Sequence, residues 1–352
     1  EKVLITLVRR SLGIVLGLLL VAASARAEIV KDLYSAEVPV ADQSPAQLAS
    51  ASRDALEAVF VKVSGSSSVL RNPAVAAALP GARQHVQQYS YNKDPGVPGG
   101  LLVEMLFDRS FVNNLMIESG APVWTANRPT VLVWLVKEEA GVQQFVNAET
   151  DPALVAQLRR EFSHRGVPLQ LPLYDLVDTS ALSVDQAQAL NSAALEQASS
   201  RYQLQDVLVG GFALQSDGRV AGKWNYFSGS DRSQRSATAE SEALFMREGV
   251  SLVAEAMAAR YAVAASAQDV GLAMSVTGVT SYADYAAVVS WLESLELVER
   301  ADVESVQGDR ILVRLQAQAA ADQMATVIEL NKQLVPIPVT GAGADLNYLW
   351  QK

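Results

Sequence analysis

The stretch Asp206-Val-Leu-Val-Gly-Gly-Phe-Ala-Leu-Gln215, followed by Ser216-Asp217-Gly218 and then by residues 219–227, decides the fold of the middle of the chain. Two runs that read as strands flank an Asp-Gly pair, which supplies the positive φ angles of a tight turn. This pattern predicts a β-hairpin. Helices are predicted on both sides of it, at 183–202 and 240–261, so we expect the hairpin to belong to a layered α/β structure.

The residues before this hairpin continue the same alternation of strands and helices. A continuous apolar run at 130–136 predicts a buried strand, and a turn leads from it into a second strand at 142–146. Asp151-Pro152 begins a helix that is expected to reach His164, and a short strand is expected at 167–173. These elements predict a central α/β sandwich over residues 123–265.

The N-terminal part predicts a separate α+β unit at residues 28–122. Ser44-Pro45 supplies an N-cap and a first-turn proline for a helix to Val63, whose apolar residues fall on one face. The other expected elements are a strand at 29–40, a short helix at 73–79, strands at 86–91 and 101–107, and a helix at 109–118.

The last part of the chain, residues 266–352, predicts a ferredoxin-like unit. Its elements follow the order β-α-β-β-α, and Leu346–Trp350 could supply the final strand. The expected elements are a strand at 270–279, a helix at 282–295, strands at 298–306 and 310–317, and a helix at 320–333. The fold class is therefore a multi-domain combination of α+β and α/β units, an arrangement that by itself decides no function.

Residues 1–27 have the three-part form of a secretory signal peptide. Basic residues come first, an apolar run covers residues 12–23, and Ala25-Arg26-Ala27 suits signal peptidase. We therefore expect cleavage between Ala27 and Glu28, and a periplasmic protein exported by the general secretory route without stable membrane insertion. An uncleaved anchor is the alternative, but a membrane span needs about 20 apolar residues.

Composition excludes several classes of function. The formal net charge is −10 and the basic residues are scattered singly, so we expect no nucleic-acid partner. The chain has no cysteine, which excludes disulfides, thiol nucleophiles and iron–sulfur clusters. Its two histidines, His85 and His164, fall in different predicted domains, so we expect no metal site built on them and no cofactor.

No catalytic motif is complete, and we therefore expect no catalytic residues. Ser90-x-x-Lys93 matches the motif of penicillin-recognising enzymes, but it lies at a strand exit and no Lys-Thr-Gly follows. Residues 218–223 resemble a phosphate-binding loop, but they are one spacer residue short, and Trp224 stands where that motif requires a hydroxyl residue. Adjacent acids such as Glu138-Glu139 are expected to be solvated. A pair of acids assembled from distant parts of the chain stays open.

The segment Gly120–Pro129 is the most distinctive stretch and the candidate interaction site. It brings together Trp124, Asn127 and Arg128, and tryptophan with arginine is typical of interaction hot spots. In the alternative interpretation, Trp124 packs between two domains and Arg128 pairs with a local acid.

Scattered residues resemble an uncharacterised family of proteobacterial envelope proteins, catalogued as domain of unknown function number two thousand sixty-six. The residues that carry this resemblance are Leu33-Tyr34, Val38-Pro39-Val40, Ser44-Pro45, Val63-Ser64-Gly65, residues 89–92, Trp124, Arg128-Pro129, Val133-Trp134-Leu135, residues 207–211 and Trp224. The resemblance implies export to the periplasm and no accepted activity. By topology alone, the middle unit also looks like the α/β domains of periplasmic envelope-assembly factors.

We therefore expect an exported, non-enzymatic factor that binds or assembles another protein of the cell envelope. Two alternatives remain: a hydrolase of envelope glycans that uses carboxylates, and a protein that binds a small ligand in a cleft between domains. The oligomeric state is left open.

Overall fold

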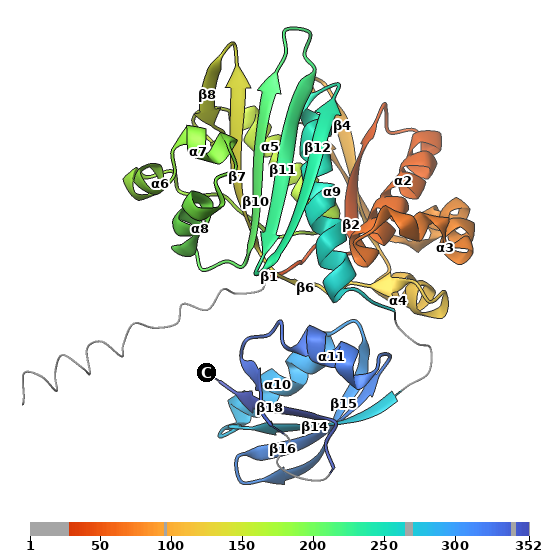
Figure 1. The fold of residues 1–352 in the computed structure, drawn as a ribbon. Coiled ribbons are helices and arrows are strands. Elements are labelled where there is room, and N and C mark those ends of the chain that lie inside the picture. The colour runs from red at the N-terminus through yellow and green to blue at the C-terminus, as the bar shows by residue number, and fades with distance from the viewer. Residues whose placement is uncertain (1–27, 95–96, 265–269, 339–342, 352) are drawn as a thin grey trace, which may run out of the picture.

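The structure is a computed structural model that describes residues 28–94, 97–264, 270–338 and 343–351. Within these residues the fold is mixed α+β, and its larger sheets follow one another along the chain (Figure 1). The expected signal peptide, including Ala27, lies outside the described residues.

The first sheet has the antiparallel order β2-β4-β3 and carries helix α2 (Pro45–Ser64) on one face. This helix confirms the sequence prediction, because the Ser44 side chain accepts the N–H of Gln47 and Gly65 ends the helix in the left-handed region, at φ 76°. The remaining bounds are β2 (Ser35–Val40), η1 (Ser67–Arg71), α3 (Pro73–Ala78), η2 (Leu79–His85), β3 (Val86–Lys93), β4 (Leu101–Phe107) and α4 (Arg109–Glu118).

The central sheet has the order β12-β11-β10-β7-β8, with the short strand β9 beside β7. Strands β9, β7 and β10 are parallel and the other pairs are antiparallel. The bounds are β7 (Val131–Glu139), β8 (Val142–Phe145), β9 (Leu169–Gln170), β10 (Asp206–Leu214), β11 (Val220–Ser228) and β12 (Asp231–Ala239).

Helices cover both faces of this sheet, as the parallel strands require. Side chains of β7 alternate between two cores: Val133 lies in the cluster with α5 and α9, and Trp134 in the cluster with α7 and α8. Figure 1 shows α6, α7 and α8 on one side of the sheet and α9 on the other. The bounds are α5 (Pro152–Arg165), α6 (Leu176–Ala181), α7 (Val184–Gln188), α8 (Ser192–Ser200) and α9 (Glu242–Tyr261).

The predicted hairpin is confirmed, and it explains the pair of glycines in β10. Gly210 lies opposite Trp224 of β11, and a Cβ on Gly210 would lie 2.3 Å from the indole ring. On the other face, a Cβ on Gly211 would lie 2.5 Å from the side-chain oxygen of Gln188 in α7. The turn differs from the expectation in one respect, because Gly218 has a positive φ of 83° and Asp217 does not.

Three local expectations in the central unit were wrong. Strand β12 was not predicted, because it is an edge strand whose residues are mostly polar and lie exposed or half-buried. The strand expected at 167–173 is only β9. The helix expected at 183–202 is divided into α7 and α8, because Leu190 adopts a φ of 56° and Asn191 starts a new helix by accepting the N–H of Ala194.

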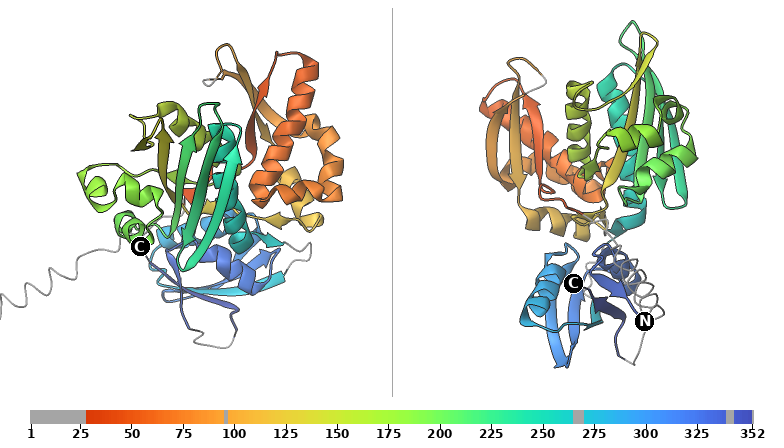
Figure 2. Two further views of the ribbon diagram at one scale, coloured as in Figure 1. Left: turned by 45° about the horizontal axis from the view of Figure 1, so that its top comes forward. Right: turned by 90° about the vertical axis from the view of Figure 1, so that its left-hand side faces the viewer.

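The third sheet has the order β15-β16-β14-β18-β17, and buried side chains of α10 and α11 join its core. Figure 2 shows this part of the molecule packed against the ends of the other two. The bounds are β14 (Val270–Thr277), α10 (Tyr282–Ser294), β15 (Val298–Gln307), β16 (Arg310–Ala317), α11 (Ala321–Ile328), β17 (Leu334–Pro336) and β18 (Leu346–Trp350).

The ferredoxin-like expectation needs correction at the end of the chain. In that fold the last strand lies antiparallel beside the first. Here β18 does lie beside β14, with Met274 opposite Leu346, but the two strands are parallel. The short strand β17 runs antiparallel to β18 at the edge of the sheet. The two strands after α11, β17 and β18, are therefore antiparallel neighbours. The second of them, β18, lies between β14 and β17 in the sheet.

Two small ladders fix the segment that joins the first and central sheets. Strand β1 (Glu28–Ile29) pairs with β6 (Asn127–Arg128), and β5 (Pro122–Val123) pairs with β13 (Val263–Ala264). The segment 122–128 is thus held on one side by the first described residues of the chain, in β1, and on the other by the residues that follow α9, in β13. No helix within the described residues has the length and apolar character that crossing a bilayer requires.

Candidate functional site

The structure places the predicted interaction residues inside the protein. Trp124 and Arg128 are fully buried, and Asn127 is 7% exposed. The predicted interaction site is therefore wrong as an exposed surface, because these three buried side chains cannot contact a partner protein. They form a buried junction instead. Trp124 packs against Gly65, where a Cβ would lie 2.7 Å from its ring, and this contact matches the alternative in which the indole fills space between units.

Arg128 is bound by backbone carbonyls and by no carboxylate within 4 Å among the described residues. Its guanidinium donates to the carbonyl oxygens of Lys62 at 2.8 Å and Gly166 at 2.9 Å. Further donations reach the carbonyls of Thr125, Trp124 and Arg165. Because these carbonyls include those at the C-terminal ends of α2 and α5, the helix dipoles stabilise the cation. Burial still lowers the pKa of Arg128 to about 9.

An exposed apolar ridge lies elsewhere, on the outer side of the central unit. It consists of Leu173, Leu176 and Val177, whose residues are 69%, 80% and 59% exposed. Single exposed apolar residues are ordinary, but three large ones within five positions are a concentration of the kind that marks interaction surfaces. Figure 1 shows α6, which carries two of them, standing out from the body of the protein.

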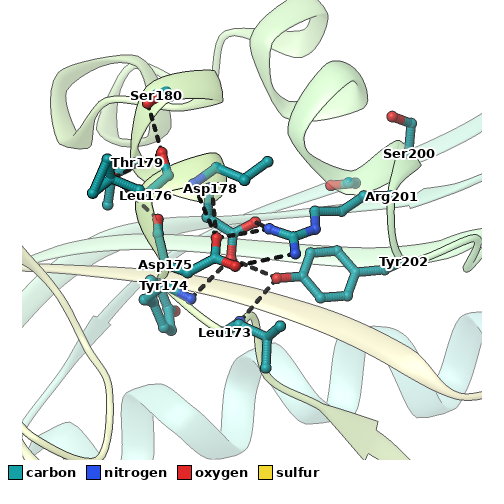
Figure 3. Close-up of polar contacts among 12 residues, drawn as sticks. Leu173, Tyr174, Asp175, Leu176, Asp178, Thr179, Ser180, Ser200, Arg201 and Tyr202 are labelled. Carbon is teal, nitrogen blue, oxygen red and sulfur yellow. Dashed lines mark hydrogen bonds and ion pairs between the residues drawn. The ribbon is translucent and has the colours of Figure 1, made fainter.

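A buried carboxylate organises the chain beneath this ridge. Asp178, which is 1% exposed, accepts the backbone N–H of Tyr174 at 2.8 Å and the hydroxyl of Tyr202 at 2.5 Å (Figure 3). Arg201 donates to the other carboxylate oxygen at 2.9 Å. The hydroxyl of Tyr202 also accepts the N–H of Leu173 at 2.8 Å, so the network reaches both ends of the turn that carries the ridge.

Asp175 completes the network from the first turn of α6. It accepts two hydrogen bonds from Arg201, at 2.7 and 3.1 Å, and its side chain caps the N–H groups of Val177 and Asp178. The bond from Arg201 is the main reason that the pKa of Asp175 is lowered to about 2. Asp175 is therefore ionised at neutral pH, and two carboxylates share one guanidinium.

The backbone of this segment is strained. Four non-glycine residues in the described chain have positive φ angles, and three of them lie between β9 and β10: Tyr174 at 53°, Leu190 at 56° and Gln203 at 54°. This conformation costs about 1–3 kcal/mol for a residue with a side chain, and such strain clusters at functional sites. The ring of Tyr174 offsets the cost by packing edge-on against Trp134, with ring centres 5.6 Å apart.

This arrangement suits binding better than acid–base chemistry. A general acid needs a raised pKa, whereas Asp175 has a lowered one, and Asp178 is fully engaged by its partners. Among the residues that the structure describes, no group of three or more histidine, aspartate or glutamate side chains could hold a metal ion. Of the motifs tested in the sequence, Ser90 and Lys93 both lie within strand β3, away from any helical turn.

Sequence reasoning missed the ridge. Residues 171–177, Leu-Pro-Leu-Tyr-Asp-Leu-Val, were assigned in part to a strand and otherwise left without an element. A usable signal was present, since apolar residues cluster after a proline and around Asp175, a residue type that caps helices. The partners Arg201 and Tyr202 follow more than 20 positions later and carry no local signal.

Comparison with known families finds a match for the N-terminal part of the chain. Residues 27–125 match a family model described as Domain of unknown function (DUF8605). This family differs from the one numbered two thousand sixty-six, so that assignment was wrong; it depended on scattered positions rather than on a dense motif. The match spans the first sheet and its helices, less than half of the chain, and shows similarity in that part alone. No curated protein matches the chain.

Proposed function

We propose that the protein is a non-enzymatic factor of the cell envelope that captures a partner protein through the ridge of Leu173, Leu176 and Val177. The observation that carries this proposal is the combination of exposed apolar side chains with a buried polar network that fixes their backbone. A surface that is ordered before binding loses less conformational entropy on association, so such a network favours recognition.

Charge indicates the chemistry of the partner. The network under the ridge holds the two carboxylates of Asp175 and Asp178 against the single guanidinium of Arg201, and the whole chain has a formal charge of −10. An anionic lipid surface would be repelled. The ridge therefore fits an apolar groove with a basic rim on another protein.

The envelope location in this proposal depends on the leader-like residues 1–27. Fractionation of cells, followed by N-terminal sequencing, tests it. A mature chain that starts at Glu28 in the periplasmic fraction supports the location, and a retained leader in the membrane fraction contradicts it.

Site-specific photo-crosslinking tests the binding role. A photoreactive amino acid at Leu176 is expected to give a discrete adduct with one protein in cells, and the isolated partner should bind the purified chain. The matched control places the same amino acid at Val142, which is 64% exposed on β8 of the same unit. We expect no adduct there.

A charge substitution separates binding from folding. Leu176→Asp should leave the melting temperature within a few degrees of the parent, because the side chain is 80% exposed, but it should abolish binding of the partner. Equal adducts at Leu176 and Val142, or full binding by the Leu176→Asp protein, would rule out the ridge as the docking surface.

A further inference from the structure

A cleft opens between the central unit and the end of α11, and its lining residues are different from those of the ridge. Its volume is about 420 Å³. The central unit contributes Asp206, Arg260 and Tyr261, and the C-terminal unit contributes Glu329, Leu330 and Lys332. Cavities of this size that combine apolar walls with a few polar groups are the usual sites for small ligands.

Asp206 and Arg260 are already engaged by the protein. Asp206 is 3% exposed and accepts the hydroxyl of Tyr226 at 2.5 Å. The guanidinium of Arg260 donates to the hydroxyl of Ser228 and to the carboxylate of Asp231. Both groups therefore have partners that hold them against the wall of the cleft.

The two charged groups from the C-terminal unit differ from each other. Glu329 hydrogen-bonds the hydroxyl of Tyr348, a residue of β18. Lys332, by contrast, has no hydrogen bond and no ion pair within the described part of the chain, although it lies near Asp206. Lys332 is thus the charged side chain of the cleft lining that has no hydrogen-bond partner among the described residues, and Tyr261 and Leu330 line the same cleft.

We propose that this cleft binds a small organic anion, with its carboxylate or similar group on Lys332 and its apolar part against Tyr261 and Leu330. The charged contact with Lys332 would orient the ligand, and the apolar walls would bury its apolar part. Small-ligand sites usually combine these two kinds of contact. This site is separate from the ridge, so the two proposals can fail independently.

Fluorine NMR with three ligands of similar shape but different charge tests whether the cleft prefers an anion. The probes are para-(trifluoromethyl)benzoate, the corresponding benzylamine and the corresponding benzyl alcohol, added to the purified full chain. We expect the benzoate to bind about tenfold more tightly than the neutral alcohol, the difference that one charge-assisted hydrogen bond supports, and the amine to bind least.

Two lysine variants localise the binding. Lys332→Gln should weaken benzoate binding about tenfold, whereas Lys223→Gln, at an exposed lysine on β11, should leave it unchanged. Lys332→Glu should reverse the preference toward the amine. Failure of the benzoate to bind, preference of the parent chain for the amine, or equal benzoate binding by Lys332→Gln and the parent would each overturn the proposal.

Discussion

The guanidinium of Arg128 lies over the indole ring of Trp124, 3.9 Å from the ring centre, and neither side chain is accessible to water. A cation against an aromatic face is stabilised by the ring quadrupole, more so where water is excluded. The pair sits where the ends of α2 and α5 meet, because Arg128 also donates to carbonyls at both ends. It therefore joins the first unit to the central one.

Replacing Trp124 with alanine should lower the free energy of unfolding by about 3–5 kcal/mol, because it removes a large side chain that is fully buried. Urea unfolding followed by circular dichroism measures this loss. A Trp124→Ala protein that unfolds at the same urea concentration as the parent would show that the indole does not support the junction.

Replacing Arg128 with methionine should cost about 2–4 kcal/mol, because several buried carbonyls lose their donor. The matched control is Arg219→Met on an exposed turn, where the ion pair with Asp217 should contribute under about 1 kcal/mol. Equal midpoints of thermal unfolding for the two variants would contradict the structural role of Arg128.

Local sequence signals predicted the capped helices and the central hairpin, because their determinants lie within a few residues. Ser44 with Pro45 fixed the start of α2, and the pattern around Gly218 fixed the connection from β10 to β11. The burial of Arg128 could not be predicted from such local signals. The carbonyls that bind it belong to residues up to 66 positions away, so a sequence pattern cannot tell a buried guanidinium from an exposed one.

The conformation of the ridge could not be predicted for the same reason, although a local cluster of apolar residues was visible in the sequence. Its shape depends on Tyr174 in a conformation that a tyrosine rarely adopts, and on Arg201, which follows 26 positions after Asp175. Apolar spacing also continues across Leu190, so the break between α7 and α8 has no periodicity signal. In such places tertiary contacts override local preference, and these are the places where function is expected.

Replacing Gly210 with alanine should destabilise the central sheet, because the new Cβ would lie 2.3 Å from the ring of Trp224, which is itself buried against Gly249. Overpacking of this kind costs about 1–3 kcal/mol. Gly81→Ala is the control, since nothing lies within 4 Å of its Cβ position. Differential scanning calorimetry should show a lower melting temperature for the first variant, and similar melting temperatures for both would count against close packing there.

Glu296 should make stability depend on pH. Burial raises the pKa of this carboxyl group, although it accepts the N–H of Ala126 at 3.2 Å and lies 3.8 Å from Arg109. Between the ordinary pKa of glutamate, about 4.3, and the raised value, the folded state binds more protons than the unfolded state. The contribution of Glu296 to stability is therefore complete below the ordinary value and is lost as pH rises through the raised one.

Glu296→Gln cannot titrate and isolates this effect. The free energy of unfolding of the parent should fall relative to that of the variant as pH rises from about 4 toward neutrality. Urea unfolding of both proteins across this range measures the difference. A difference that stays constant with pH would show that the carboxyl group is not perturbed.

Replacing Asp178 with asparagine should loosen the ridge without unfolding the protein. The change keeps the size of the side chain but removes the charge that binds Arg201. The new NH2 group must face either the guanidinium of Arg201 or the N–H of Tyr174, and neither of these donors can accept a hydrogen bond. Because the strained turn depends on those bonds, its local opening should become more frequent, and the cost is about 1–3 kcal/mol.

Hydrogen exchange read by mass spectrometry distinguishes this local effect from global destabilisation. In Asp178→Asn, peptides that cover residues 171–178 should exchange faster, while peptides from β7 and β10 keep the protection of the parent. Asp185→Asn, at an exposed acid in the first turn of α7, should exchange like the parent throughout. Unchanged exchange at 171–178 in Asp178→Asn would mean that the buried carboxylate does not hold the turn. Faster exchange there, with binding of the partner reduced but not abolished, would show that the network orders a surface whose apolar side chains make the contact.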